Sequence, residues 1–191
     1  GLPEALGLVG IDLPGIQETV YTIASRGAGK SVRGRSAFVQ LLVNALVDRL
    51  IRDLELTRAN VIVNAGGNAL LLCRWTAELE SELESFGMAT NRVLFAGIGG
   101  SAFSGFAGDL SLAIACQEVP WDVLVYPIRR RTDEGEPVSA WQYYEKLLKQ
   151  RLTAAKQQPF GGLLDRPESL QWFFTPDPIL SNRYCAVCRR P

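Results

Sequence analysis

The feature that most constrains the fold is a long amphipathic segment, residues 36–56, which has the spacing of a single α-helix. Ser36 is a typical N-cap residue, and charged residues such as Asp48 and Arg52 fall opposite an apolar stripe. We expect this stripe to pack against a sheet, because a helix with one apolar face has to cover another layer. The stripe consists of Phe38, Leu41, Leu42, Ala45, Leu46, Val47, Leu50 and Leu54.

The remaining patterns predict an α+β domain. An apolar run ends in Asp12 and reads as a buried strand, and Pro14 and Gly15 turn the chain out of it. We predict helices over residues 16–25, 36–56, 77–86 and 139–156, strands over 6–12, 61–64, 69–75, 92–96 and 110–119, and loops over 97–108 and 126–137. This order is βαββαβ with additions, a ferredoxin-like arrangement in which helices cover one face of an antiparallel sheet.

The composition limits the kinds of reaction and metal site that the chain can support. The 191 residues include no histidine, which excludes Ser-His-Asp and Cys-His catalysis and a histidine-ligated metal. Lys and Arg total 20, as do Asp and Glu, so the formal net charge is zero and any contact with nucleic acid has to be local. A reaction here has to use carboxylates, lysines, an oxygen-ligated metal or a bound nucleotide.

The four cysteines fall into two groups. Cys73 and Cys116 sit in apolar runs and are expected to be buried core thiols, whereas Cys185 and Cys188 form a C-x-x-C pair. Such a pair supplies half of a four-ligand zinc site, so Zn²⁺ would bind only with further downstream ligands. The cysteine usage suits a reducing compartment, and without a signal peptide or membrane-length apolar run we expect a cytoplasmic protein. Because the sequence lacks an initiator Met and ends shortly after Cys188, we expect a piece of a longer protein.

Residues 24–31 (ASRGAGKS) nearly match a phosphate-binding P-loop. A true P-loop has glycine where Ala24 stands and follows a strand, whereas helical spacing precedes this segment. Arg26, Lys30, Arg33 and Arg35 place four cations within ten residues, among glycines and before the long helix. Three interpretations stay open: a P-loop ATPase, a solvated basic loop, and a phosphate-binding loop at a helix N-terminus, where the dipole favours anions.

The first strand and the hairpin offer few metal ligands. Asp12 lies where palm-type polymerases and cyclases hold a metal-binding carboxylate, although Asp at such a position also caps turns. In those enzymes the facing hairpin carries two acids, but here its tip reads Ala65, Gly66, Gly67 and Asn68. We therefore expect a structural or nucleotide-lining site, and no two-metal catalysis by this domain alone.

Taken together, these segments resemble the first palm-type, nucleotide-cyclase-like domain of the large subunit of type III CRISPR effector complexes. The resemblance runs nearly end to end and is most specific in the basic segment, while Ile11 and Pro14 depart from the residues usual in the family. The resembling segments are residues 11–17 (IDLPGIQ), 21–36 (YTIASRGAGKSVRGRS), 65–70 (AGGNAL), 112–118 (LAIACQE), 154–163 (AAKQQPFGGL) and the cysteine pair at 185–188.

The resemblance implies a share in a composite activity. Large subunits of this family make cyclic oligoadenylates from ATP with Mg²⁺ when target RNA binds, and a second palm carries the catalytic Gly-Gly-Asp-Asp. That motif and an HD nuclease domain are both missing here, so no residue is expected to be catalytic. The implied partners are the second palm, other effector subunits, and crRNA or target RNA, with no membrane. The residues implied to line the nucleotide are Asp12, Gly15, Gln17, Ser25, Lys30, Arg33, Arg35 and Gly67.

We expect a palm-type domain over residues 1–158, followed over 159–191 by a linker and the start of a zinc-binding module. In the site, Lys30, Arg33 and Arg35 would neutralise phosphate, the two glycines would let backbone approach the ligand, and Asp12 would help to hold a metal or ribose. The alternative is a scaffold module that contacts crRNA or neighbouring subunits without nucleotide. A free-standing cyclase of the GGDEF type is disfavoured by the missing acids at residues 66–68.

Overall fold

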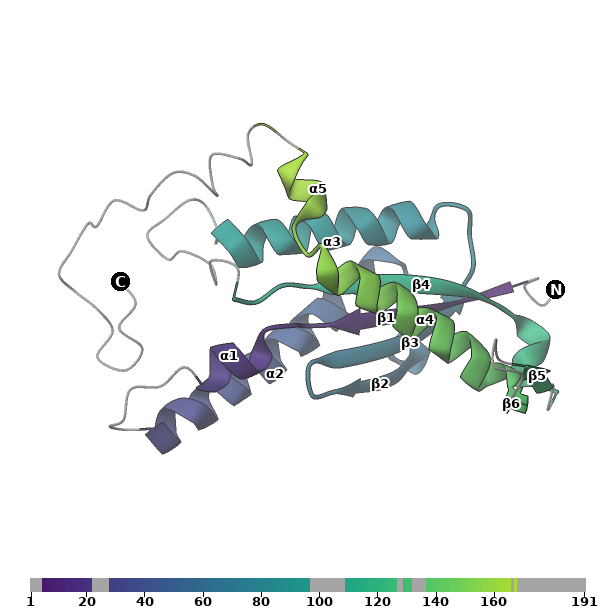
Figure 1. Cartoon of the computed structure of the whole chain (residues 1–191), viewed down its shortest axis with the longest axis horizontal. Helices are drawn as coiled ribbons and strands as arrows, with labels where there is room; N and C mark the ends of the chain where they lie inside the picture. The colour runs from purple at the N-terminus through teal and green to yellow at the C-terminus, as the bar shows by residue number, and fades with distance from the viewer. Residues whose placement is uncertain are drawn as a thin grey trace.

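A four-stranded antiparallel sheet forms the centre of the molecule. The computed structural model describes residues 5–21, 28–96, 109–126, 129–131, 137–165 and 167, without the side chains of 28–31, 96 and 129–131. The strands are β1 (Ala5–Asp12), β2 (Val61–Ala65), β3 (Asn68–Arg74) and β4 (Ala113–Pro120), in the order β2-β3-β1-β4 (Figure 1). With helical segments between β1 and β2 and again between β3 and β4, this order confirms the predicted ferredoxin-like βαββαβ core.

The helices and the short elements complete the chain. The helices are α1 (Ile16–Tyr21), α2 (Ala28–Asp53), α3 (Leu79–Ala96), α4 (Ala140–Gln157) and α5 (Gly161–Leu164), with 3-10 turns η1 (Arg58–Asn60) and η2 (Trp121–Leu124). Strands β5 (Arg129–Arg131) and β6 (Pro137–Ser139) form a separate two-stranded sheet, where the sequence predicted only a loop. No helix in the described part of the chain is long and apolar enough to cross a membrane.

Strand β1 is buried on both of its faces. Val9 and Ile11 belong to the larger apolar cluster, which includes the stripes of α2 and α3, whereas Leu8 packs with α4. Figure 1 shows α4 in front of the sheet and α2 behind it. The prediction that helices cover one face is thus incomplete, since α4 covers the second face. The continuous apolar run of β1 indicates that both faces of the strand are covered, because a strand with one solvent-exposed face alternates apolar and polar residues.

Helix α2 begins at Ala28, eight residues before the predicted N-cap Ser36. Most of the segment that we expected to be a glycine-rich loop is therefore the first two turns of the helix. Ala, Lys and Arg are strong helix formers, and a glycine inside a helix, such as Gly34, is tolerated at a cost of about 1 kcal/mol relative to alanine. The sequence analysis gave the glycines more weight than these helix propensities, and it therefore predicted a loop.

Helix α3 continues to Ala96 and includes residues 92–96, where the sequence predicted a strand. The apolar spacing of Leu79, Leu83 and Phe86 reaches on to Leu94, so the helical period is not interrupted. Asn91 is buried within this stretch, and its side chain bonds the backbone N–H and C=O of Leu112 at 2.6 and 3.0 Å. These bonds anchor the helix to the chain that enters β4.

Helix α4 begins as predicted. The Ser139 hydroxyl accepts a bond from the backbone N–H of Gln142 at 3.2 Å, and the Gln142 side chain accepts one from the N–H of Ser139 at 3.1 Å. This reciprocal capping box satisfies two backbone donors that the first helical turn leaves unpaired.

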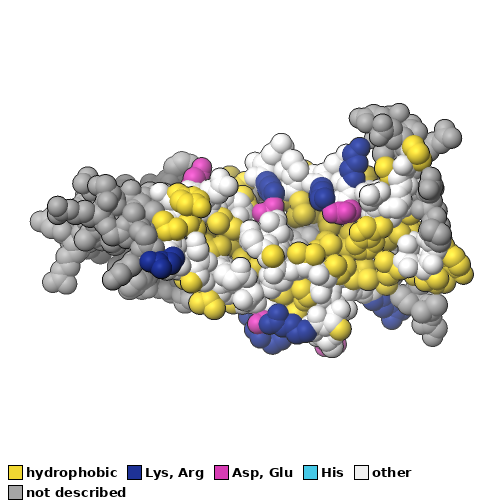
Figure 2. Space-filling view, turned by 90° about the horizontal axis from the view of Figure 1, so that it is seen from below, with side chains coloured by type: hydrophobic (Ala, Val, Ile, Leu, Met, Phe, Trp, Pro, Cys, Tyr) yellow, Lys and Arg dark blue, Asp and Glu magenta, His cyan; other side chains and the backbone are white. Residues whose placement is uncertain are grey.

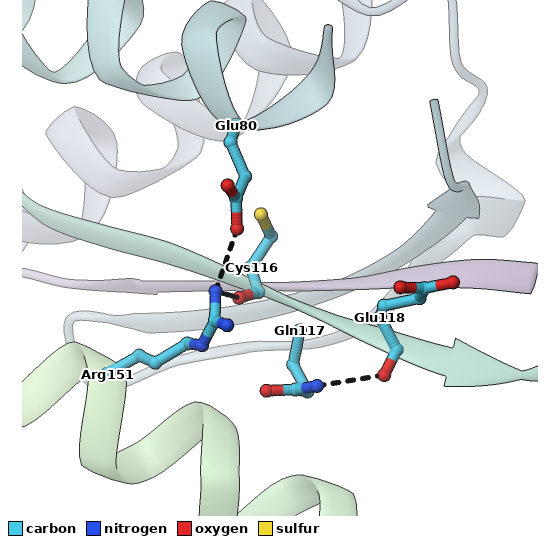
Figure 3. Close-up of polar contacts among 5 residues, drawn as sticks. All are labelled: Glu80, Cys116, Gln117, Glu118 and Arg151. Carbon is cyan, nitrogen blue, oxygen red and sulfur yellow. Dashed lines mark hydrogen bonds and ion pairs between the residues drawn. The ribbon is translucent and has the colours of Figure 1, made fainter. Parts of the chain in front are cut away.

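Arg151 of α4 reaches over the edge strand β4 to α3. Its Nη1 donates to the backbone oxygen of Cys116 at 3.1 Å and to Glu80 at 2.8 Å (Figure 3). The next side chain of the strand, that of Gln117, donates to the backbone oxygen of Glu118 at 2.9 Å. Side chains therefore occupy backbone acceptors along β4 and tie the two helical layers together across it.

Gly34 provides a test of the helical assignment. A Cβ at this exposed position would meet no atom within 4 Å, so Gly34→Ala should raise the free energy of unfolding by about 0.5–1 kcal/mol. Gly87→Ala in α3 is the matched control, because its Cβ would press on Ile114 at 3.0 Å and should bring no such gain. Urea unfolding measures both; a loss of stability in Gly34→Ala would contradict a helix at this position.

The burial of Cys73 and Cys116 predicts low thiol reactivity. Desolvation raises the pKa of both thiols to about 11, which lowers the thiolate fraction near neutral pH about 100-fold. Disulfide-exchange labelling at about pH 8, read out by mass spectrometry at each site, should be at least about 100-fold slower in the folded chain than in denaturant. Equal rates in the two states would show that these thiols are accessible.

Candidate functional site

The end of β1 and the tip of the β2–β3 hairpin meet at one end of the sheet. Asp12 is in register with Asn68 on one side and with Ala113 on the other. One residue further, the N–H of Leu13 donates to the oxygen of Gly67 at 3.0 Å. The sequence analysis nominated Asp12 and Gly67 separately, and the register of the sheet brings them together.

Both nominated glycines are required by close packing at this junction. Gly15 has a φ of 90°, and a Cβ there would overlap the backbone oxygen of Asp109. Gly67 has a φ of 91°, and its Cβ would overlap the side chain of Ile16. Left-handed backbone favours glycine, and here the space beside each Cα is filled by protein atoms. Packing therefore requires both glycines whether or not a ligand approaches them.

Helix α1 joins this junction to the basic start of α2. The N–H of Thr19 donates to the oxygen of Gly15 at 2.9 Å, and Nη1 of Arg35 donates to the oxygen of Thr19 at 2.7 Å. Arg35 thus holds α1 against α2. The nominated Gln17 is exposed on α1, and Arg33 is exposed on α2.

Four nominated residues are placed only in part or not at all. Lys30 lies in the first turn of α2, but its side chain is not described, and Ser25 lies outside the described residues. The cysteine pair Cys185 and Cys188 also lies outside them. The nominated zinc half-site and the contribution of Ser25 stay predictions.

Asp12 forms an ion pair with Lys156 in the last turn of α4. The Asp12 side chain is 19% exposed and that of Lys156 is 38% exposed. The sequence analysis did not single out Lys156 as a site residue. The signal for it was present, since Leu148, Leu152 and Lys156 recur every four residues and so share one face of α4.

The surface near the hairpin is partly apolar. Strand β2 is the lower edge of the sheet in Figure 1, and Ile62 and Val63 on it are each 46% exposed. Seen from that side, hydrophobic side chains run along much of the surface, with charged ones scattered among them (Figure 2).

The sequence of the chain matches, over residues 5–174, the family described as "Csm1 subunit domain B". The chain belongs to this family. A relative from Thermococcus onnurineus, named "CRISPR system single-strand-specific deoxyribonuclease Cas10/Csm1 (subtype III-A)", is 30% identical over 161 residues, which cover 78% of this chain and 17% of the relative. The resemblance to the large subunit of type III CRISPR effectors is confirmed.

Solved Csm1 structures share the fold of this domain B. One, described as "Crystal structure of Csm1-Csm4 cassette in complex with cA4", has a TM-score of 0.64 and 28% identity over 89% of this chain and 22% of that chain. Another, described as "Crystal structure of Csm1-Csm4 cassette in complex with one ATP", has a TM-score of 0.61 and 27% identity over 88% of this chain and 21% of that chain. The chain spans less than a fifth of the length of the curated relatives that it matches.

The P-loop interpretation does not fit this Csm1 domain B. A P-loop joins a strand to a helix, whereas the element that leads toward the basic segment is helix α1. The predicted helical spacing before residue 24 already disfavoured this interpretation.

The described residues of this domain B do not suit a magnesium ion. Mg²⁺ prefers several oxygen ligands, usually with one or two carboxylates, and the carboxylate of Asp12 is already paired with Lys156. Within the described ranges, no group of three or more His, Cys, Asp or Glu residues could hold a metal. The hairpin tip opposite Asp12 contributes only neutral residues.

Gly15 and Gly66 form a matched pair for testing the packing at this junction. Gly15→Ala should lower the free energy of unfolding by about 3 kcal/mol, because it combines left-handed strain with an overlap against backbone. Gly66→Ala should cost about 1 kcal/mol, because Gly66 has a φ of 63° and open space around it. Chemical denaturation gives both values, and equal losses would contradict the close contact between Gly15 and Asp109.

Proposed function

We propose that this chain supplies one half of an ATP-binding site in the large subunit of a type III CRISPR effector complex, where ATP is converted to cyclic oligoadenylate. Its membership of the Csm1 domain B family supports this proposal. So do the related Csm1-Csm4 structures described as complexes with one ATP and with cA4. The other half of the site would come from a second palm domain of the same subunit.

The observation that carries the proposal is the meeting of three elements at one end of the sheet. The end of β1 and the hairpin tip are hydrogen-bonded, and α1 links them to the cationic first turns of α2. Lys30 and Arg33 would neutralise phosphate charge there, since charge-assisted bonds to phosphate are stronger than neutral ones. Gln17 and Ser25 complete the proposed lining, together with Asp12, Gly15, Arg35 and Gly67.

The reaction that this site would serve is nucleotidyl transfer. A 3′-hydroxyl of one adenosine attacks the α-phosphorus of an ATP molecule, and pyrophosphate leaves with the electron pair of the broken P–O bond. The residues of this domain would bind and orient the triphosphate, which lowers the entropic part of the barrier. Activation of the hydroxyl would belong to the second palm, because the described residues here do not suit a metal.

The alternative function is that of a scaffold which contacts crRNA or neighbouring subunits without binding nucleotide. The exposed apolar side chains of β2 favour some contact with another surface. Csm4 accompanies Csm1 in the related structures, and a Csm4-like subunit is the partner that we propose. The proposed palm-type domain ends at residue 158, and residues 159–191 lead into a separate module. In that module Zn²⁺ would bind to Cys185, Cys188 and further ligands downstream.

ATP titration of the intact large subunit tests the proposal. Arg33→Ala should weaken ATP binding about 10-fold, because it removes one charge-assisted phosphate contact. Arg58→Ala is the control: it removes the same charge from an exposed side chain that pairs with Asp48.

Equal ATP affinity in the wild type, Arg33→Ala and Arg35→Ala would contradict the proposed site. Loss of RNA binding in these variants, with a steep dependence on salt and no ATP binding by the wild type, would instead support the scaffold function.

A further inference from the structure

Helix α4 runs alongside β1 with matched spacing. Leu8 and Leu148 share the smaller apolar cluster, and a Cβ at Gly10 would lie 3.1 Å from Leu148 and 2.7 Å from Leu152. The next step along both elements is the ion pair of Asp12 with Lys156. Residues two apart on a strand share a face, as do residues four apart on a helix. The absence of a side chain at Gly10 therefore lets α4 approach closely enough for Lys156 to reach Asp12.

Lys156 is the one basic residue in the last turn of α4, and its ammonium group pairs with the Asp12 carboxylate. A cation there is also favoured by the partial negative charge of the carbonyls at a helix C-terminus. Without its ammonium group, this corner of the proposed site would repel a polyphosphate.

We propose that Lys156 is a phosphate-binding residue of the nucleotide site, held on Asp12 before the nucleotide arrives. This inference rests on the function proposed above. On binding, the ammonium group moves from the Asp12 carboxylate to an oxygen of the triphosphate, which carries more negative charge than a single carboxylate. Because both side chains are partly exposed, the existing ion pair is weak enough to exchange.

The test measures ATP and adenosine binding by the intact large subunit and its variants. Lys156→Ala should raise the Kd for ATP about 10-fold and leave adenosine binding unchanged, because adenosine has no phosphate. Lys156→Arg keeps the charge and should stay within about 3-fold of the wild type. Lys149→Ala is the matched control on the same helix: Lys149 pairs with Glu145 at 2.7 Å, and its removal should change neither affinity.

Asp12→Asn separates exchange from a direct role of the carboxylate. If the lysine moves from Asp12 to phosphate, this variant should bind ATP about 3-fold more tightly than the wild type, since a competing anion is removed. A Kd raised as much as in Lys156→Ala would overturn the exchange and assign the carboxylate to the ligand. Thermal unfolding of each variant verifies that the fold is intact. If Lys156→Ala unfolds, Lys156→Gln, which removes the charge and keeps a polar side chain, carries the test with the same expected loss of ATP affinity.

The two proposals fail in different ways. If the wild type binds no ATP, the proposed function falls, and this inference falls with it. If Arg33→Ala weakens ATP binding while Lys156→Ala and Lys156→Arg both match the wild type, the function stands and the assignment of Lys156 is wrong.

Discussion

The structure depends on the two-sided burial of β1. This strand is hydrogen-bonded to β3 and β4 along its two edges, and its side chains alternate between the layer of α2 and α3 and the layer of α4. A shift of one residue would exchange the two sets, placing Gly10 where Val9 now packs. The register is therefore strongly specified, and Asp12 at the end of the strand takes a fixed position.

The order of strands and helices could be predicted because each element has a local period. The errors arose where a local signal competed with a wider one. Glycines suggested a loop before Ser36, but the strong helix formers around Gly34 extend α2 to Ala28. Residues 92–96 resembled a strand when taken alone, yet Leu94 continues the apolar face of α3. The position of α4 on the second face of the sheet was not predicted, because it depends on which strands lie side by side and on what covers each face.

The candidate site was predictable only in part, for a physical reason. Strand ends and hairpin tips follow from sequence, so Asp12 and Gly67 could be nominated, and the hairpin register brings them together. Lys156 reaches Asp12 through the packing of α4 on β1, which depends on the space that Gly10 leaves. Such a contact joins distant parts of the chain, and no local spacing reports it. Arg35 was nominated from the sequence as a phosphate contact, whereas in the structure its guanidinium donates to the backbone oxygen of Thr19 in α1. The sequence did not indicate this contact either.

The two edge strands of the sheet, β2 and β4, differ in how freely their backbone could pair with another strand. Along β4, Arg151 and Gln117 occupy backbone oxygens, and an incoming strand would have to displace them. Strand β2, in contrast, pairs with β3 alone among the described strands and exposes Ile62 and Val63. Among the described strands, a further strand would therefore displace fewer side-chain hydrogen bonds by pairing with β2 than by pairing with β4.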